Sequence, residues 1–378
     1  VKKLPWGDEL IFGTNMAYGN NDSKDFSYYK LDYLQGPMPS DYRNNYLNNK
    51  RHYYNYQGLA LYNFRFLNGL TWNCYYQYSQ SYDRNENPRY RLDFIDGWGV
   101  DDSHQLGELP DDDLLMTAID NGNSVYTGRL TKVNALQTGL NYMKDKDGNY
   151  DFFNLSFDFR HTDEALNYAR GAINVRNTRS YWAFNPNISF YHRSKNTGFI
   201  NASISRNIMP SDPVSMVAYV DDSNPLAIRM GNPDLKNGAT NIVRFYIHRM
   251  KQKIQQRISL NLSYTYEENA VVQSYTFDKE TGAYTYKPIN SNGKYSASAG
   301  LEFGRQIDKK GLFKFDGNIR LDFNHQLQAA LSEGNTSAQI YGVNVLSETQ
   351  SATVTYKKND LTLSAGGRFT WGHSSSKL

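Results

Sequence analysis

In the segment 311–325, GLFKFDGNIRLDFNH, residues 313–324 alternate apolar and polar side chains without a break. Successive side chains of an extended strand point to opposite faces, so the apolar ones share a face: Phe313, Phe315, Gly317, Ile319, Leu321 and Phe323. The other face carries charges of both signs: Lys314, Asp316, Asn318, Arg320, Asp322 and Asn324. The segment therefore predicts a strand with one face against an apolar environment and the other in water.

The same alternation recurs along the chain and predicts about 13 strands and no helix. The strongest other runs cover 54–66, 70–79, 153–160, 257–266, 295–303 and 361–371. Weaker runs cover 8–18, 132–143, 180–192, 198–208, 240–249 and 345–357. Asn68-Gly69, between two of the runs, is a strong hairpin signal.

Short and long connections alternate between these runs. Short turns are predicted near 68–69, 144–149, 193–197, 250–255, 307–310 and 357–360. Long polar connections are predicted at 19–51, 81–131, 162–179, 209–239, 267–292 and 326–344. In an up-and-down antiparallel array this alternation puts every short turn at one end, which is the organisation of transmembrane β-barrels. The chain is accordingly predicted to be an all-β barrel whose partner is a lipid bilayer.

The strands of a soluble β-sandwich also alternate apolar and polar residues, so this fold is the competing interpretation. Several runs exceed the usual length of soluble strands and approach the 9–11 residues of a tilted membrane strand. Greek-key connections would not sort loop lengths to two ends. Aromatic residues also stand near strand ends, where a lipid-interface girdle would lie: Trp72, Trp182, Tyr266 and Trp371. These features favour the membrane barrel.

Composition agrees with a thin apolar band on an otherwise wet structure. Aromatic residues make up 15% of the 378 residues, yet the mean hydropathy is −0.70. The formal net charge of +3 gives no reason to expect nucleic acid as a partner. No apolar run is long enough for a transmembrane helix, and residues 1–6 do not resemble a signal peptide. The single cysteine, Cys74, excludes a disulfide within the chain.

The strand count suggests that residues 1–378 are a portion of one barrel. Bacterial barrels usually have an even number of strands, and an open sheet edge is not stable in hydrocarbon. About 13 strands, with the last one ending near Ser374, therefore predict further strands beyond the C-terminus and before the N-terminus.

A motif then points to a family. Residues 231–236 read GNPDLK and precede a predicted strand: Gly231, Asn232, Pro233, Asp234, Leu235 and Lys236. This segment resembles the GNP-x-L-K segment in the C-terminal barrel of TonB-dependent receptors. Together with residues 269–303 it looks especially like the outer-membrane β-barrel family common in Bacteroidota. The simplest role for the motif itself is structural, since Asn232-Pro233 and Asn237-Gly238 are turn dipeptides that return a long loop to a strand.

The resemblance implies a larger barrel of about 22 strands in the outer membrane of a Gram-negative, Bacteroidota-like cell. It implies uptake of a siderophore, oligosaccharide or peptide, coupled to the TonB complex through an N-terminal region. A surface lipoprotein is a further candidate partner. The coupling box and plug domain of such receptors do not occur in this sequence, nor does their closing C-terminal strand. A plug-free channel or surface adhesin, and a soluble all-β binding protein, are the alternatives.

No motif indicates catalysis or a cofactor, and the histidines lack metal-ligand spacing. An acidic loop contains Asp101, Asp102, Glu108, Asp111, Asp112 and Asp113, and carboxylates at such density can bind Ca²⁺, with Asp111, Asp112 and Asp113 as the candidates. Because the EF-hand spacing is missing, a solvated charged surface is the simpler interpretation.

Two further groups of residues are candidates for contact with a solute. Charges predicted to face the lumen could pair with a plug or with each other: Arg160, Arg257, Lys314, Asp316, Arg320 and Asp322. Loop aromatics offer stacking surfaces for a sugar, peptide or aromatic siderophore: Trp98, Tyr126 and Tyr219. They could equally pack the loops against one another.

Overall fold

Thirteen long antiparallel strands form one curved wall in the part of the chain described by this computed structural model. The described residues are 2–3, 7–32, 40–99, 104, 107–330 and 339–376. In spatial order the wall consists of β2 (Glu9–Leu31), β3 (Asp41–Leu67), β4 (Leu70–Asn87), β6 (Val125–Lys146), β7 (Asn149–Arg170), β8 (Ile173–Ser194), β9 (Gly198–Met209), β12 (Gly238–Lys251), β13 (Gln256–Glu268), β16 (Lys294–Gln306), β17 (Phe313–Ala330), β18 (Gln339–Lys358) and β19 (Leu361–Ser376).

Shorter elements lie in the connections. They are β1 (Lys2–Lys3), β5 (Arg89–Arg91), β10 (Val220–Asp221), β11 (Ala227–Met230), β14 (Ala270–Phe277), β15 (Tyr284–Ser291), the six-residue helix α1 (Asp112–Thr117) and the 3-10 turns η1 (Leu92–Phe94) and η2 (Gln252–Ile254). Among the described residues, no helix has the length and apolar character to cross a membrane.

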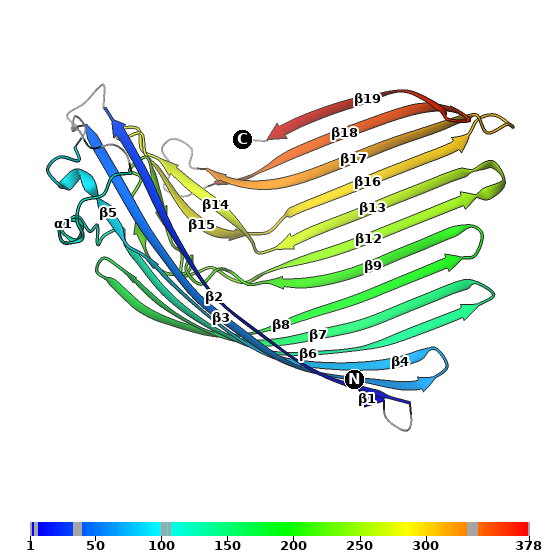
Figure 1. The fold of residues 1–378 in the computed structure, drawn as a ribbon, viewed down its shortest axis with the longest axis horizontal. Coiled ribbons are helices and arrows are strands. Elements are labelled where there is room, and N and C mark those ends of the chain that lie inside the picture. Colours follow the sequence, from blue (N-terminus) through cyan, green and yellow to red (C-terminus); the bar gives the residue numbers. More distant parts are fainter. Residues whose placement is uncertain are drawn as a thin grey trace.

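The thirteen long strands correspond one to one with the thirteen runs in the sequence, which confirms the predicted all-β fold. Figure 1 shows the six predicted short turns gathered at one end of the wall and α1, β5, β14 and β15 toward the other. Asp147 and Gly148, at φ 55° and 79°, make a two-residue turn of the hairpin type between β6 and β7.

Four of the six predicted long connections are shorter than expected because the strands beside them continue past the predicted runs: 19–51, 81–131, 162–179 and 326–344. The connections at 209–239 and 267–292 lie between their long strands as predicted, although they contain β10, β11, β14 and β15. The clearest error concerns residues 162–179, expected as a polar loop. β7 runs to Arg170 and β8 begins at Ile173, so only two residues join them. The alternation of apolar and polar residues fades there because neither face of this extension lies against the hydrocarbon layer. A small helix, α1, was also not expected.

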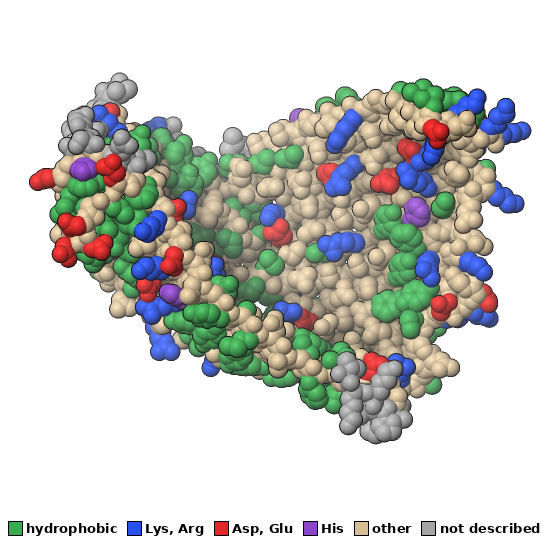
Figure 2. Space-filling view, in the orientation of Figure 1, with side chains coloured by type: hydrophobic (Ala, Val, Ile, Leu, Met, Phe, Trp, Pro, Cys, Tyr) green, Lys and Arg blue, Asp and Glu red, His purple; other side chains and the backbone are tan. Residues whose placement is uncertain are grey.

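The strand registers place the apolar side chains of successive strands on one common face. Leu262 lies opposite Phe245 on one side and Ala299 on the other, and Ala299 lies opposite Leu321. These side chains form an exposed apolar outer face, while the inner face is polar. Figure 2 shows the hollow of the wall lined mainly by polar groups, with basic and acidic side chains scattered over it.

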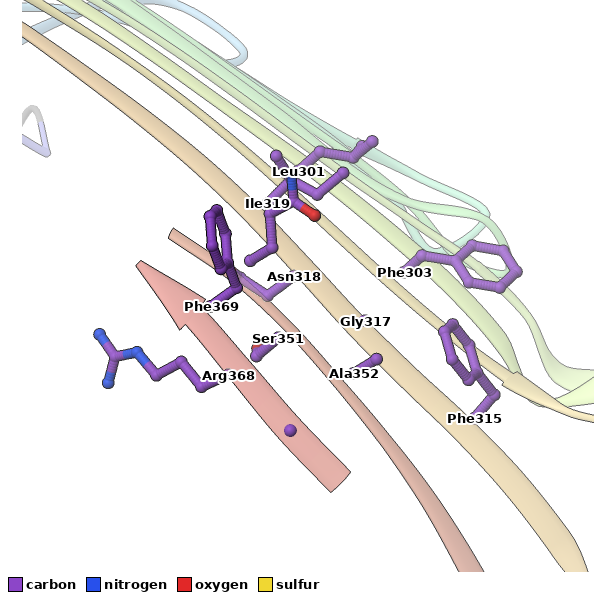
Figure 3. Close-up of a pocket in the computed structure, with 12 residues that line it drawn as sticks. Leu301, Phe303, Phe315, Gly317, Asn318, Ile319, Ser351, Ala352, Arg368 and Phe369 are labelled. Carbon is purple, nitrogen blue, oxygen red and sulfur yellow. The ribbon is translucent and has the colours of Figure 1, made fainter. Parts of the chain in front are cut away.

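Small residues hollow the outer face near the C-terminal strands (Figure 3). Gly317, Ala352 and Gly367 are cross-strand neighbours in β17, β18 and β19. Larger side chains border them and leave an apolar groove of about 550 Å³: Leu301, Phe303, Phe315, Ile319 and Phe369. Arg368 points away from Phe369 in Figure 3, as period-2 alternation requires. The groove faces the hydrocarbon side of the wall, so it is no route for a polar solute.

One polar pair interrupts the outer face. Glu348 lies opposite Leu321 and Trp371, and Gln350 lies opposite Ile319 and Phe369. The carboxamide of Gln350 donates a hydrogen bond to the carboxylate of Glu348. The pair thus satisfies part of its own hydrogen-bonding need on an otherwise apolar surface.

Candidate functional site

Charges on the inner face pair with their neighbours in the wall. Arg257 and Lys314 both contact Asp316, at 2.8 and 2.9 Å. Arg320 pairs with Asp322 at 2.7 Å. Each of these side chains remains partly exposed, so the pairs are hydrated and contribute little to stability. Together they present a wet surface of nearly balanced charge.

Arg160 lies on the same inner face but in another part of the wall. Its guanidinium contacts Asp158 at 2.8 Å, two residues away in β7. Five of the six candidate charges therefore gather on β13 and β17, and the sixth stands apart on β7. A wall with these pairs can hydrate or hydrogen-bond a polar solute without selecting strongly for its charge.

The GNP segment holds three parts of the chain together at the end of the wall opposite the short turns. Because transmembrane barrels place their short turns in the periplasm, this end is called the extracellular end. The side chain of Asn232 is buried and donates from Nδ2 to the carbonyl of Pro288 in β15, at 2.8 Å. Its backbone N–H donates to the carbonyl of Ser215, and its Oδ1 accepts from the N–H of Asp234. Leu235 is also buried. Asn232 thus fixes the loop before β12 to both the β14–β15 hairpin and the loop after β9.

Gly231 and Pro233 shape the same clamp. The N–H of Gly231 donates to the carbonyl of Tyr219, and a Cβ atom at position 231 would lie 1.7 Å from the carbonyl oxygen of Val217. Only glycine permits this close approach of two backbones. Pro233 has no N–H to satisfy at the turn, and the Asp234 side chain is exposed.

We expect Gly231→Ala to open this clamp. The added methyl group must displace the Val217 carbonyl, which should cost about 1–3 kcal/mol of local stability. Hydrogen exchange of the amides in 213–237 should rise. Gly300→Ala in β16 is the matched control, because a Cβ there has no atom within 4 Å. Equal hydrogen-exchange protection of 213–237 in Gly231→Ala and Gly300→Ala would show that the close approach at Gly231 does not hold this loop.

Trp98 packs within the loops. Its ring lies against a buried cluster and stacks on His104 with 3.7 Å between ring centroids and 5° between planes. Its indole N–H donates to the carbonyl of Glu108 at 3.4 Å. The centre of this cluster is Tyr46, stacked between Phe26 and Tyr90. Trp98 therefore has packing partners on both its face and its edge.

Tyr219 and Tyr126 occupy two other settings. Tyr219 belongs to a second buried cluster, where its ring stacks on Tyr168 and lies 5.8 Å from the guanidinium of Arg170. Tyr126 is exposed and lines a small hollow with Tyr82, on the outer side of the wall extension. The three candidate aromatics are thus distributed over separate surfaces and do not form one stacking platform.

A buried ionic network at the extracellular end had no signal in the sequence pattern. The carboxylate of Glu164 is 2% exposed and receives hydrogen bonds from both Arg129 and Arg179. Arg179 also donates to the carbonyl of Ser211 at 2.6 Å. Asp212 lies 3.8 Å from Arg129. The network ties the loop after β9 to the inner side of β7 and β8.

A second buried pair lies nearby. Arg170 is 4% exposed and donates to Asp221 at 2.7 Å and to the carbonyl of Gly122 at 2.9 Å. Burial would raise the pKa of Asp221, but hydrogen bonds from Arg170 and Ser223 outweigh it and lower the pKa from 3.8 to about 2. The pair therefore stabilises this loop region while the carboxylate is ionised.

The depressed pKa of Asp221 predicts a defined pH dependence. A carboxyl with a lowered folded-state pKa stabilises fully above its unfolded value, so the contribution should fade as pH drops from about 4 to about 2. We expect a local loss of about 1–2 kcal/mol, measured by hydrogen exchange of 213–223 corrected for intrinsic rates. Asp221→Asn should lack this dependence. If the hydrogen-exchange protection of 213–223 in the unmodified protein did not change over that pH range, the Arg170–Asp221 pair would not stabilise the loop.

The acidic loop residues have a structural use. Asp111 caps α1, since its Oδ1 accepts from the N–H of Leu114 at 2.9 Å. Asp112 and Asp113 lie in the first turn, where the helix dipole favours negative charge. Within the described residues, no three His, Cys, Asp or Glu side chains are grouped so as to hold a metal ion. Asp101 and Asp102, also considered from the sequence, lie outside the described residues.

Comparison with known sequences identifies the family. The sequence model of the outer membrane protein beta-barrel family matches residues 153–373. The chain therefore belongs to the outer membrane protein beta-barrel family, and its wall is an outer-membrane β-barrel wall. None of the curated proteins matches the chain.

Several solved structures are similar to the chain at low identity. One is Pseudomonas aeruginosa FpvA bound to heterologous pyoverdines, at 14% identity and a TM-score of 0.44, with 96% of this chain and 54% of that chain covered. A second is the Serratia marcescens hemophore receptor HasR in complex with HasA and heme, at 9% identity and a TM-score of 0.37, with 98% of this chain and 70% of that chain covered. A third is the Acinetobacter baumannii siderophore receptor PirA, at 9% identity and a TM-score of 0.33, with 86% of this chain and 64% of that chain covered. The chain spans about half the length of the first such structures.

Proposed function

We propose that this chain is part of the wall of a TonB-dependent outer-membrane receptor in a Bacteroidota-like cell. Membership of the outer-membrane barrel family supports the location. The GNPDLK segment supports the receptor class by its resemblance. In this proposal the coupling box, the plug and further strands lie outside residues 1–378, and the TonB complex binds the N-terminal region.

The width of the wall is the observation that carries the proposal. Thirteen strands pair in sequence from β2 to β19, and the registers of the described residues contain no pairing between these two strands. Barrel diameter grows with strand number, and barrels of about 22 strands are wide enough to hold a plug. In the proposed barrel of about 22 strands, this wall would enclose a lumen wide enough for a plug.

The inner face suggests the class of solute. The charges on β13 and β17 pair with each other, and these three cations and two carboxylates leave only a small net charge there: Arg257, Lys314, Asp316, Arg320 and Asp322. Such a surface suits a polar solute of low net charge that is too large for porins, such as an oligosaccharide, a peptide or a siderophore. A surface lipoprotein could contact the extracellular loops as a further partner.

Planar-bilayer conductance of the full-length natural protein tests the proposal. A plugged receptor should be nearly silent and should conduct only when the plug is removed, and uptake in cells should stop when the proton gradient is dissipated. Stable open conductance of the unmodified protein would instead establish a plug-free channel. Asp316→Asn on the inner face should alter ion selectivity of the unplugged barrel, whereas Leu301→Ala on the outer face should leave it unchanged.

A further inference from the structure

The outer face of β6, β7 and β8 changes character just beyond the apolar band. Phe159 and Phe184 face lipid, and Trp182 follows them with 70% of its surface exposed. The ring of His161 lies 4.7 Å from that of Trp182. Tryptophan at this position is typical of the boundary between hydrocarbon and headgroups. The next residues toward the extracellular end therefore lie at the depth of lipid headgroups.

A hollow of about 550 Å³ opens at that depth, between β6 and β8. Two exposed cations line it, Lys132 from β6 and Arg176 from β8, and the hydroxyl-bearing Thr178 and Ser180 line it as well. The register fixes their arrangement, because Lys132 lies opposite Asp163 and Asp163 lies opposite Ser180. Among the described residues, neither cation forms an ion pair within the protein.

The remaining charges at the hollow already have partners. Glu164 and Arg179, which also line it, are bound to each other in the buried network. Asp163 lies 3.6 Å from His161. The two free cations therefore give the hollow an attraction for an anion, opposed only by Asp163.

We propose that this hollow binds the phosphorylated headgroup of a lipid in the outer leaflet. Lys132 and Arg176 would donate charge-assisted hydrogen bonds to the phosphate, and Thr178 and Ser180 would donate to phosphate or sugar oxygens. The acyl chains would then lie against the apolar band below, beside Trp182. That continuity with the hydrocarbon surface favours a lipid over a free anion, because one molecule can occupy both surfaces.

Lipid binding by the full-length protein in detergent tests the proposal. We would titrate monophosphoryl lipid A and the same lipid without its phosphate, using native mass spectrometry and fluorescence of the adjacent Trp182. Lys132→Gln with Arg176→Gln should weaken binding of the phosphorylated lipid by roughly tenfold or more, because two charge-assisted contacts are lost. Asp163→Asn should strengthen it, since the opposing charge is removed.

The control pair is Lys309→Gln with Lys310→Gln in the turn before β17, at the opposite end of the wall. It should leave lipid binding unchanged. Equal affinity of the Lys132/Arg176 variant and the unmodified protein, or equal affinity for both lipids, would overturn the proposal. Displacement of the lipid by low millimolar inorganic phosphate would show a site for a free anion, and would also overturn it. These readouts do not involve transport, so they are independent of the proposed receptor function.

Discussion

Leu262→Arg is expected to lower the free energy of unfolding in a lipid bilayer by about 2–4 kcal/mol. Leu262 lies on the outer face of β13 with Phe245 and Ala299 as its cross-strand neighbours, so an arginine there has no carboxylate beside it. Asn261→Arg is the matched control one residue away on the inner face, where water and polar groups surround the new charge. Urea unfolding of protein refolded into vesicles measures both.

Leu321→Arg should lower the free energy of unfolding clearly less than Leu262→Arg does, although both replace a leucine on the outer face. Its cross-strand neighbour on the same face is Glu348, which can pair with the new guanidinium. In a Glu348→Gln background the cost of Leu321→Arg should rise toward that of Leu262→Arg, a coupling that a double-mutant cycle isolates. If Asn261→Arg and Leu262→Arg lowered the free energy of unfolding equally, the inner and outer faces of the wall would be wrongly assigned.

The sequence predicts the wall wherever one face of a strand meets lipid. Residues 313–323 alternate strictly because each outward side chain must be apolar and each inward one meets water. β17 (Phe313–Ala330) contains nearly all of the run predicted at 311–325 and extends five residues beyond it. Gln350 and Glu348 weaken the pattern in β18, and the prediction for 345–357 was correspondingly weaker, yet the strand pairs with β17 without a break. Lipid contact is therefore the physical origin of the signal.

That signal disappears outside the membrane. Residues 163–170 continue as a strand, but there the inner side chains Glu164, Leu166 and Arg170 are buried under the loop after β9. Both charged and apolar residues occupy the same face, so period-2 hydrophobicity cannot identify it. Extended strands beyond the bilayer thus look like polar loops in the sequence.

The extracellular packing depends on contacts between residues far apart in the chain. Asn232 is 56 residues from Pro288, whose carbonyl it binds. The sequence marks Asn232-Pro233 as a turn, but it does not identify the hairpin that the turn holds. Aromatic composition has the same limit, because Trp98 in a packed loop and a tryptophan in a ligand site have the same local sequence signal.

Glu164→Ala is expected to cost about 3 kcal/mol or more, the largest effect of a single substitution at the extracellular end. Removing a carboxylate that is 2% exposed leaves Arg179, itself 17% exposed, as an uncompensated charge. Arg129 is 39% exposed and can turn toward water, so it should add less to the cost. Asp163→Ala on the outer side of the same strand is the matched control and should change stability by no more than about 0.5 kcal/mol.

The cost of Glu164→Ala should fall when Arg179→Met is added, because the double variant removes the stranded charge along with its partner. A remaining cost is expected, since Arg179 also holds the carbonyl of Ser211. Urea unfolding of the single and double variants in vesicles, with hydrogen exchange of 209–217, separates the two contributions. If Glu164→Ala lowered stability no more than Asp163→Ala does, the Glu164 carboxylate would be hydrated, and the loop after β9 would be held by the Asn232 clamp and the Arg170–Asp221 pair instead.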